Sequence, residues 1–190
     1  MIDEKKFVQD YLGDLSKLIL PKESLVEELI DIKKKIDEVK KSGKKLLIFG
    51  NGGSSAIASH FSVDMTKNAK VRCINCNEAD LITCFSNDYG YEKWVEKAVE
   101  FYGDAGDMLI IISSSGKSKN IVNGCLAAKN KKFKYIITLT GHENNSPVSK
   151  LGDVNLWVDS KAYNFIENTH QIWLLTIVDL IIGKSEYPPN

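Results

Sequence analysis

The pattern of hydrophobic and polar positions divides the chain into a helical front part and a longer part in which short apolar runs alternate with amphipathic segments. Between residues 4 and 42 it predicts two helices separated at Pro21. Because a narrow apolar seam usually packs against other helices, we expect residues 1–43 to form an oligomerisation arm that contacts a partner chain. The seam of the second helix recurs at alternating steps of four and three: Leu25, Leu29, Ile32, Ile36 and Val39.

From residue 44 onward, the pattern predicts strands that alternate with helices. Apolar runs separated by helices are typical of a parallel sheet that is covered on both faces. We therefore predict an α/β fold for residues 44–190: a three-layer sandwich with a five-stranded parallel sheet. The expected strands are 46–49, 71–74, 108–112, 135–139 and 154–158. The expected helices are 54–67, 79–85, 91–102, 118–129 and 162–182.

Length and charge narrow the class of protein. The 190 residues suit one domain with an added arm. The formal net charge is zero and charges of both signs are interspersed, which argues against nucleic acid or an anionic membrane as the main partner. No apolar run is long enough to span a bilayer, and the first residues lack a secretory pattern, so we expect a cytoplasmic protein. The four cysteines are expected to be buried, reduced thiols.

The stretch that follows the first expected strand carries the first candidate chemistry. Gly50-Asn51-Gly52-Gly53 comes directly after the apolar run and directly before a helix. Glycines permit a tight turn, and the free N–H groups of a helix start attract an anion such as phosphate. His60 and Asp64 stand four residues apart on that helix and share a face. A plain turn and a surface pair are the alternatives, while a dinucleotide fingerprint would need glycine in place of Ser55.

A second loop, after the expected strand at 108–112, is rich in hydroxyl groups. Ser113, Ser114, Ser115 and Ser118 surround Gly116. Hydroxyls and backbone N–H groups at the carboxyl end of a strand suit phosphate oxygens, although serines near a turn also serve as plain caps. A nucleotide-binding P-loop is excluded because it requires glycine at position 111, where the chain has isoleucine.

Three segments together resemble the SIS (sugar isomerase) domain: GNGGSS at 50–55, SNDYGYE at 86–92 and SSSGKSKN at 113–120. Within that superfamily the chain resembles the phosphoheptose isomerases. The resemblance covers residues 44–182 and implies a flavodoxin-like SIS fold, a homo-oligomer that is typically a tetramer, and a sugar phosphate as ligand. It implies a phosphate site at Ser113, Ser114, Ser115 and Ser118, and a substrate site that also includes Asn51, Gly52, Gly53, Asn87 and Asp88.

The resemblance also implies which residues are catalytic and where the chain departs from the family. The family's histidine and glutamate on the first helix of the domain fall on His60 and Asp64, and its glutamine on the last helix falls on Glu167. A further family histidine, which is catalytic and binds zinc, falls on Leu175. We expect Glu167 to be the base, with His60 or His170 as its partner. His60, Asp64 and Glu167 could hold a divalent metal such as zinc, weakly if at all.

Two functional hypotheses follow. The first is an aldose–ketose isomerase of sugar phosphates, with sedoheptulose 7-phosphate converted to heptose 7-phosphate for the heptose of surface polysaccharides, or with another sugar phosphate as substrate. The second is a non-catalytic SIS protein that binds a phosphosugar or acts as an adaptor for a replication initiator. The acid-rich set of His60, Asp64 and Glu167 favours the enzyme, because an adaptor has no need of it.

Overall fold

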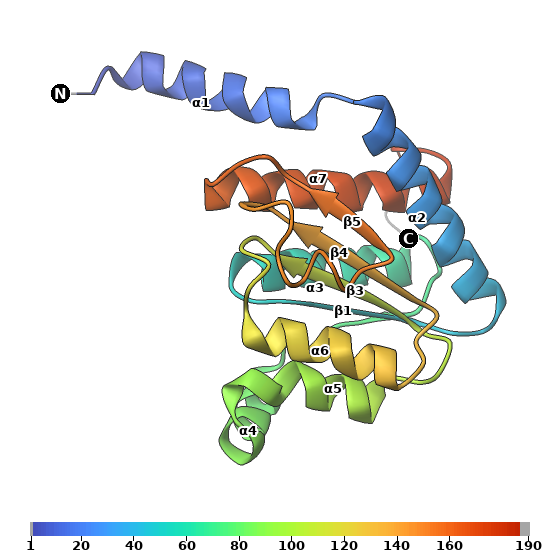
Figure 1. Ribbon diagram of the computed structural model, residues 1–190. Helices are drawn as coiled ribbons and strands as arrows, with labels where there is room; N and C mark the ends of the chain where they lie inside the picture. Colours follow the sequence, from blue (N-terminus) through green and yellow to red (C-terminus); the bar gives the residue numbers. More distant parts are fainter. Residues whose placement is uncertain (1, 187–190) are drawn as a thin grey trace.

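The structure is a computed structural model that describes residues 2–186, and it begins with two helices. Helix α1 spans Glu4–Ile19 and α2 spans Glu23–Lys41. The apolar seam of α2 is buried in the chain's own core, against α7 and the sheet. It therefore needs no partner chain to cover it, contrary to the expectation for an arm formed by residues 1–43. Only α1, which has no buried residue, extends away from the body (Figure 1).

The centre of the molecule is a five-stranded sheet in which every pairing is parallel. The strand order is β2-β1-β3-β4-β5, so the chain first winds to one side of β1 and then returns to the other. This arrangement confirms the predicted three-layer sandwich. The strands are β1 Leu46–Gly50, β2 Cys73–Ile74, β3 Met108–Ser113, β4 Tyr135–Thr140 and β5 Val154–Trp157.

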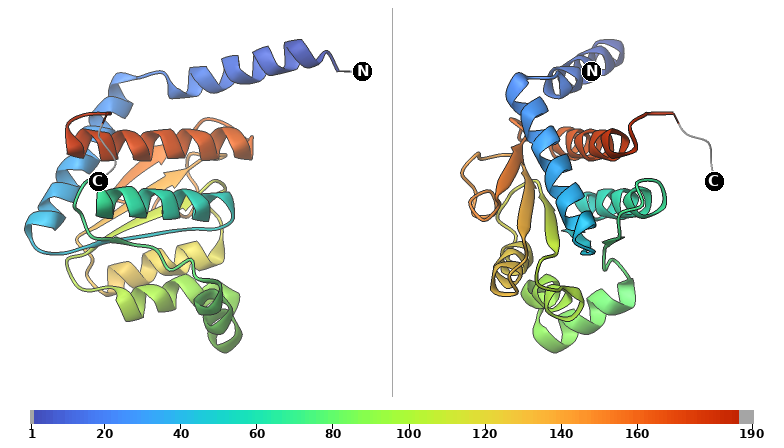
Figure 2. Two further views of the ribbon diagram at one scale, coloured as in Figure 1. Left: turned by 180° about the vertical axis from the view of Figure 1, so that it is seen from behind. Right: turned by 90° about the vertical axis from the view of Figure 1, so that its right-hand side faces the viewer.

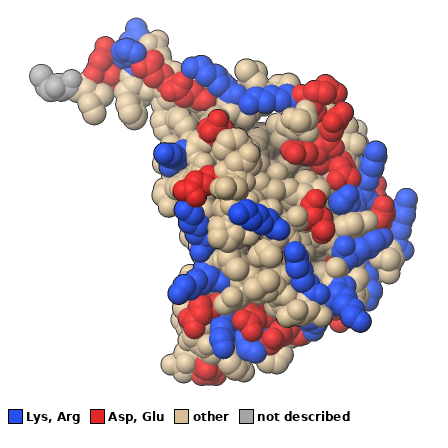
Figure 3. All heavy atoms as spheres, viewed as in Figure 1, with Lys and Arg blue, Asp and Glu red and all other residues tan. Residues whose placement is uncertain are grey.

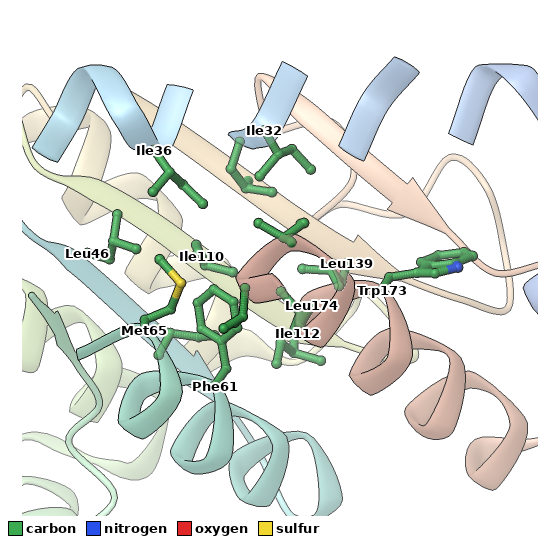
Figure 4. Packing of buried hydrophobic residues seen from close by; sticks show 14 of the residues in the cluster. Ile32, Ile36, Leu46, Phe61, Met65, Ile110, Ile112, Leu139, Trp173 and Leu174 are labelled. Atoms are coloured by element: carbon green, nitrogen blue, oxygen red, sulfur yellow. The ribbon is translucent and has the colours of Figure 1, made fainter. Parts of the chain in front are cut away.

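Helices cover both faces of the sheet (Figure 2). On one face α2, α3 and α7 enclose a core that includes Phe61, Met65, Ile110 and Trp173 (Figure 4). On the other face α4, α5 and α6 enclose a second core around Phe49 and Trp94. The remaining helices are α3 Gly53–Lys67, α4 Ala79–Tyr89, α5 Trp94–Tyr102, α6 Lys119–Asn130 and α7 Tyr163–Ile182, with a 3₁₀ turn at Tyr91–Lys93.

Strand β2 is shorter than the sequence predicts. The backbone N–H of Ala69 donates to Asp64 and that of Val71 donates to Met65, so residues 69–71 are bound to the end of α3 instead of to β1. The expectation of four buried cysteines is wrong for Cys84, which is exposed on α4. Burial raises the pKa of the Cys76 and Cys125 thiols to about 12, which leaves them unreactive.

A buried ion pair fixes the amino ends of β1 and β3. Asp107 is fully buried and accepts hydrogen bonds from the Lys45 ammonium at 2.6 Å, the Lys45 N–H at 3.1 Å and the Asp104 N–H at 2.8 Å. The carboxylate of Asp107 is thus matched by three donors and links the residue before β1 to the residue before β3. None of the described helices is long and apolar enough to cross a membrane.

Candidate active site

The candidate site lies where the chain reverses its direction of winding, between the carboxyl ends of β1 and β3. Gly50 pairs with Ile112, so the two strands end level and their loops diverge from neighbouring points. Ligands of doubly wound sheets bind at such a switch point. A pocket of about 140 Å³ opens there. It is lined by Asn51, Ser54, Ile112, Ser113, Ser114, Ser115, Ser118, Tyr163 and Glu167.

The turn from β1 into α3 tolerates little besides glycine. A Cβ atom on Gly50 would lie 2.6 Å from the backbone carbon of Ser54. Gly52 has a φ of 56°, in the region that side chains disfavour. The turn consequently brings the start of α3, with its free N–H groups, up to the pocket. The tight glycine turn is therefore formed as predicted, but Gly52 and Gly53 are not among the residues that line the pocket.

The serine loop forms the opposite wall of the pocket. Ser113 and Ser114 are each 6% exposed, and the Ser114 hydroxyl is buried without a hydrogen-bond partner. Ser118 occupies the N-cap position of α6 but makes no side-chain capping bond. Gly116, with a φ of 62°, packs so closely on Ser146 that a side chain there would collide with it. The hydroxyls of Ser114 and Ser118 are thus not engaged as caps and remain free for a ligand.

Two asparagines connect the glycine turn with the serine loop. Asn51 donates to Asn120 at 3.1 Å, and Asn120 donates back to the side-chain amide oxygen of Asn51 at 2.8 Å. The Tyr91 hydroxyl donates to that same oxygen at 3.2 Å. Asn51 therefore positions the two loops with its amide, in addition to lining the pocket. Sequence reasoning missed Asn120 and Tyr91; the available signal was a polar residue in the first turn of α6, beside the serine motif.

Glu167 reaches the pocket from the first turns of α7. Its carboxylate lies directly over Gly53, so closely that a Cβ atom on that glycine would be 2.7 Å from the carboxyl carbon. The carboxylate therefore faces the positive end of the α3 dipole, which favours a negative charge. Glu167 and the serines share one pocket, as the sequence-based assignment of a base requires.

His60 and Asp64 lie further along α3, seven and eleven residues beyond Gly53, or about 10 and about 16 Å along the helix. His60 Nε2 is 3.2 Å from the Asp64 carboxylate, and the side-chain nitrogen of Gln171 is 3.2 Å from His60 Nδ1. Gln171 follows Glu167 by four residues, about 6 Å along α7 at 1.5 Å per residue. The pair predicted from the sequence is thus formed, but neither residue lines the pocket that contains Glu167. The histidine side chain is 47% exposed.

Other predicted site residues lie elsewhere. His170 is fully buried, its Nε2 is 3.1 Å from the Thr140 carbonyl, and burial lowers its pKa to about 4. It therefore cannot pair with Glu167 in the pocket, and that part of the prediction is wrong. Asn87 and Asp88 are exposed on α4, where Asn87 donates to Asp88 at 2.9 Å. They do not line the pocket of this chain.

The proposed metal ligands do not converge. Across residues 2–186, no three histidine, cysteine or acidic side chains are grouped so that they could hold a metal ion. Glu167 lines the pocket, whereas the other two proposed ligands, His60 and Asp64, lie outside it. Leu175, one turn beyond Gln171 on α7, is half-buried against the core and offers no ligand atom.

Comparisons with known proteins agree with this architecture. A model of the SIS domain matches residues 11–141. The phosphoheptose isomerase of Aliarcobacter butzleri is 32% identical over 186 residues, which cover 95% of this chain and 97% of the relative. The probable phosphoheptose isomerase of Thermoplasma acidophilum is 32% identical over 192 residues, or 97% and 98%. The structure of phosphoheptose isomerase GmhA from Neisseria gonorrhoeae superposes with a TM-score of 0.87 at 28% identity, covering 94% of this chain and 98% of that one.

Proposed function

The chain belongs to the SIS domain family, within its phosphoheptose isomerases, and on this premise we propose that it isomerises a ketose phosphate to an aldose phosphate. Sedoheptulose 7-phosphate is the proposed substrate, and a heptose 7-phosphate for surface polysaccharide is the product. The observation that carries the proposal is a single pocket that combines the four serines of the loop after β3 with a carboxylate, Glu167. A pure phosphate-binding pocket gains nothing from that negative charge.

The pocket combines groups that suit both ends of such a substrate. In sedoheptulose 7-phosphate the phosphate is at one end of the carbon chain, and the reacting C1 and C2 atoms are at the other. The serine loop would hold the phosphate through hydroxyl and N–H donors. Glu167 lines this pocket and supplies the base, while His60 and Asp64, further along α3 and outside the pocket lining, supply further acids and bases.

The reaction moves one proton between neighbouring carbons through an enediol. We assign the proton-accepting role to Glu167, whose carboxylate lies at the start of α3. The free N–H groups of that helix start would stabilise the negative oxygen that develops as the proton leaves carbon. Asp64, oriented by His60, would exchange protons with the sugar oxygens.

The donor set does not fit a resident zinc ion. Both ring nitrogens of His60 already have partners, and Leu175 replaces a histidine ligand. No step is therefore assigned to a metal, and elemental analysis of the purified protein should find no tightly held stoichiometric zinc.

Assembly and location complete the proposal. On α1, Phe7, Val8 and Leu12 are each more than half exposed, which favours burial against other copies in a homotetramer. Light scattering tests this: a stable monomer at micromolar concentration would contradict it. The surface in Figure 3 intersperses basic and acidic side chains, which supports a cytoplasmic protein with no nucleic-acid or membrane partner.

The decisive experiment follows proton exchange. The protein is incubated with sedoheptulose 7-phosphate in deuterated water, and NMR detects deuterium at the carbon next to the carbonyl. We expect exchange by the native protein and none by Glu167→Gln, because an amide cannot accept the proton. Exchange that survives Glu167→Gln would move the base to Asp64. No exchange with any ketose phosphate would favour the non-catalytic binding protein.

A further inference from the structure

The contact between Gln171 and His60 assigns a role to a residue that no sequence motif singled out. An amide nitrogen has only N–H groups to offer, so Gln171 donates to His60 Nδ1 across their 3.2 Å separation. Because Nδ1 then accepts, the neutral ring carries its hydrogen on Nε2. That nitrogen faces Asp64 at 3.2 Å, so the ring donates to the carboxylate.

We propose that Gln171 is a positioning residue of the isomerase site, which holds His60 in the Nε2–H tautomer and aims it at Asp64. The proposal rests on the proposed function for its kinetic consequence, but its structural content stands on these two contacts alone. Gln171 touches His60, not the pocket lining, and therefore acts through that ring.

Asp64 gains most from this arrangement. Its other carboxylate oxygen accepts a hydrogen bond from Asn68 at 3.1 Å, so donors from both sides fix the carboxylate. The aspartate side chain is short, so its carboxylate reaches few orientations and depends on these two contacts. A chain of donors from α7 through the imidazole ring supplies that orientation, and it requires the Nε2–H tautomer that Gln171 and Asp64 favour together.

The neighbouring residues on α7 explain why this position matters. Glu167, Gln171 and Leu175 are spaced by four residues and share the helix face that lies along α3. Leu175 cannot hydrogen bond, and Glu167 already lies over Gly53. Among these three residues of α7, Gln171 alone is left to hold the exposed ring of His60.

The direct test is the tautomer itself. The chain has three histidines, so ¹⁵N-histidine labelling gives a simple two-bond ¹⁵N–¹H spectrum, in which His60 is assigned by the loss of its signals in His60→Gln. In the native protein we expect Nδ1 in the range of a ring nitrogen without hydrogen, and Nε2 in the range of one with hydrogen. Nδ1 carrying the hydrogen in the native protein would overturn the proposal.

Two variants complete the test. Gln171→Met keeps side-chain length but removes the donor to Nδ1, so the ¹⁵N signal of Nδ1 should shift, while Asp64 still accepts from Nε2–H. Gln171→Glu presents an acceptor to Nδ1, so both ring nitrogens should carry hydrogen. In Gln171→Met we expect kcat to fall by about tenfold, with KM nearly unchanged. The control is Gln9→Met, at the other glutamine of the chain, on α1.

The outcomes separate the two ideas. Equal kcat in native protein and Gln171→Met, or unchanged His60 signals in that variant, would overturn the role of Gln171. If the native protein shows no turnover of any ketose phosphate, the proposed function fails. The NMR spectra still decide whether Gln171 donates to His60 Nδ1.

Discussion

Adding one methyl group at Gly53 should displace the proposed base without unfolding the protein. An alanine Cβ would lie 2.7 Å from the carboxyl carbon of Glu167 and 2.9 Å from Oε1, and closer still to Oε2. Ordinary contact begins near about 3.5 Å, so the carboxylate must retreat by about 1 Å. Gly53 does not have a positive φ, and alanine keeps the backbone N–H at the start of α3. The helix end and its anion-binding groups therefore persist.

The expected effect on catalysis is large. A displacement of about 1 Å costs on the order of 100-fold in kcat, or about 2.7 kcal/mol in the activation barrier. The free energy of unfolding should stay level or rise by about 0.4–1 kcal/mol, because alanine restricts the unfolded chain and favours the helix. The assay combines steady-state kinetics on sedoheptulose 7-phosphate with urea unfolding of Gly53→Ala.

A matched control separates catalysis from helix stability. Gly13→Ala makes the same chemical change in α1, where no atom lies within 4 Å of the added Cβ. It should gain stability and keep native kcat. Native kcat in folded Gly53→Ala would refute the assignment of Glu167 as base. A stability loss above about 2 kcal/mol would refute the assumption that its side chain can move aside.

Three further outcomes are expected. Ser115→Ala with Ser118→Ala should weaken sugar-phosphate binding, by about 1.5–3 kcal/mol for each lost charge-assisted bond, in calorimetric titration with an unchanged melting temperature; unchanged affinity would leave these serines only a structural role. Asp107→Ala should lower the free energy of unfolding by about 3–5 kcal/mol, because the N–H groups of Lys45 and Asp104 lose their acceptor and the Lys45 ammonium keeps only the exposed Asp104, while kcat remains native. Burial lowers the pKa of His170 to about 4, so between pH 6.5 and 4 the unfolded chain binds a proton that the folded chain excludes. The free energy of unfolding should therefore fall by about 3 kcal/mol as the pH is lowered from 6.5 to 4. His170→Gln should lack that part of the pH dependence.

The fold could be predicted because local signals and long-range packing agree. Short apolar runs such as residues 108–112 predict buried strands, and the periodicity of α2 identifies its apolar face. Where the two conflicted, the prediction was wrong. Residues 69–71 have strand-like neighbours, yet their N–H groups bind the end of α3. The α2 seam was read correctly as a packing face, but the face it meets belongs to the same chain.

The site was predictable to the extent that it lies on two loops. The glycine turn and the serine loop each follow a strand, and parallel strands end at one edge. Side chains that enter from elsewhere carry no such signal. Helix α7 is apolar nearly all round, so its rotation could not be deduced from periodicity, and His170 turned out to face the core. Asn120 and Gln171 became visible only through their contacts with Asn51 and His60.

The ion pair of Lys45 and Asp107 lies at the amino ends of β1 and β3, whereas the pocket lies at their carboxyl ends. The groups that hold the strands together are therefore separated from those that touch a sugar by the full length of the sheet. Substitutions in the pocket should leave this foundation intact. The acids and histidines of the site can therefore be substituted, and the substrate changed, while the contacts that stabilise the fold are kept.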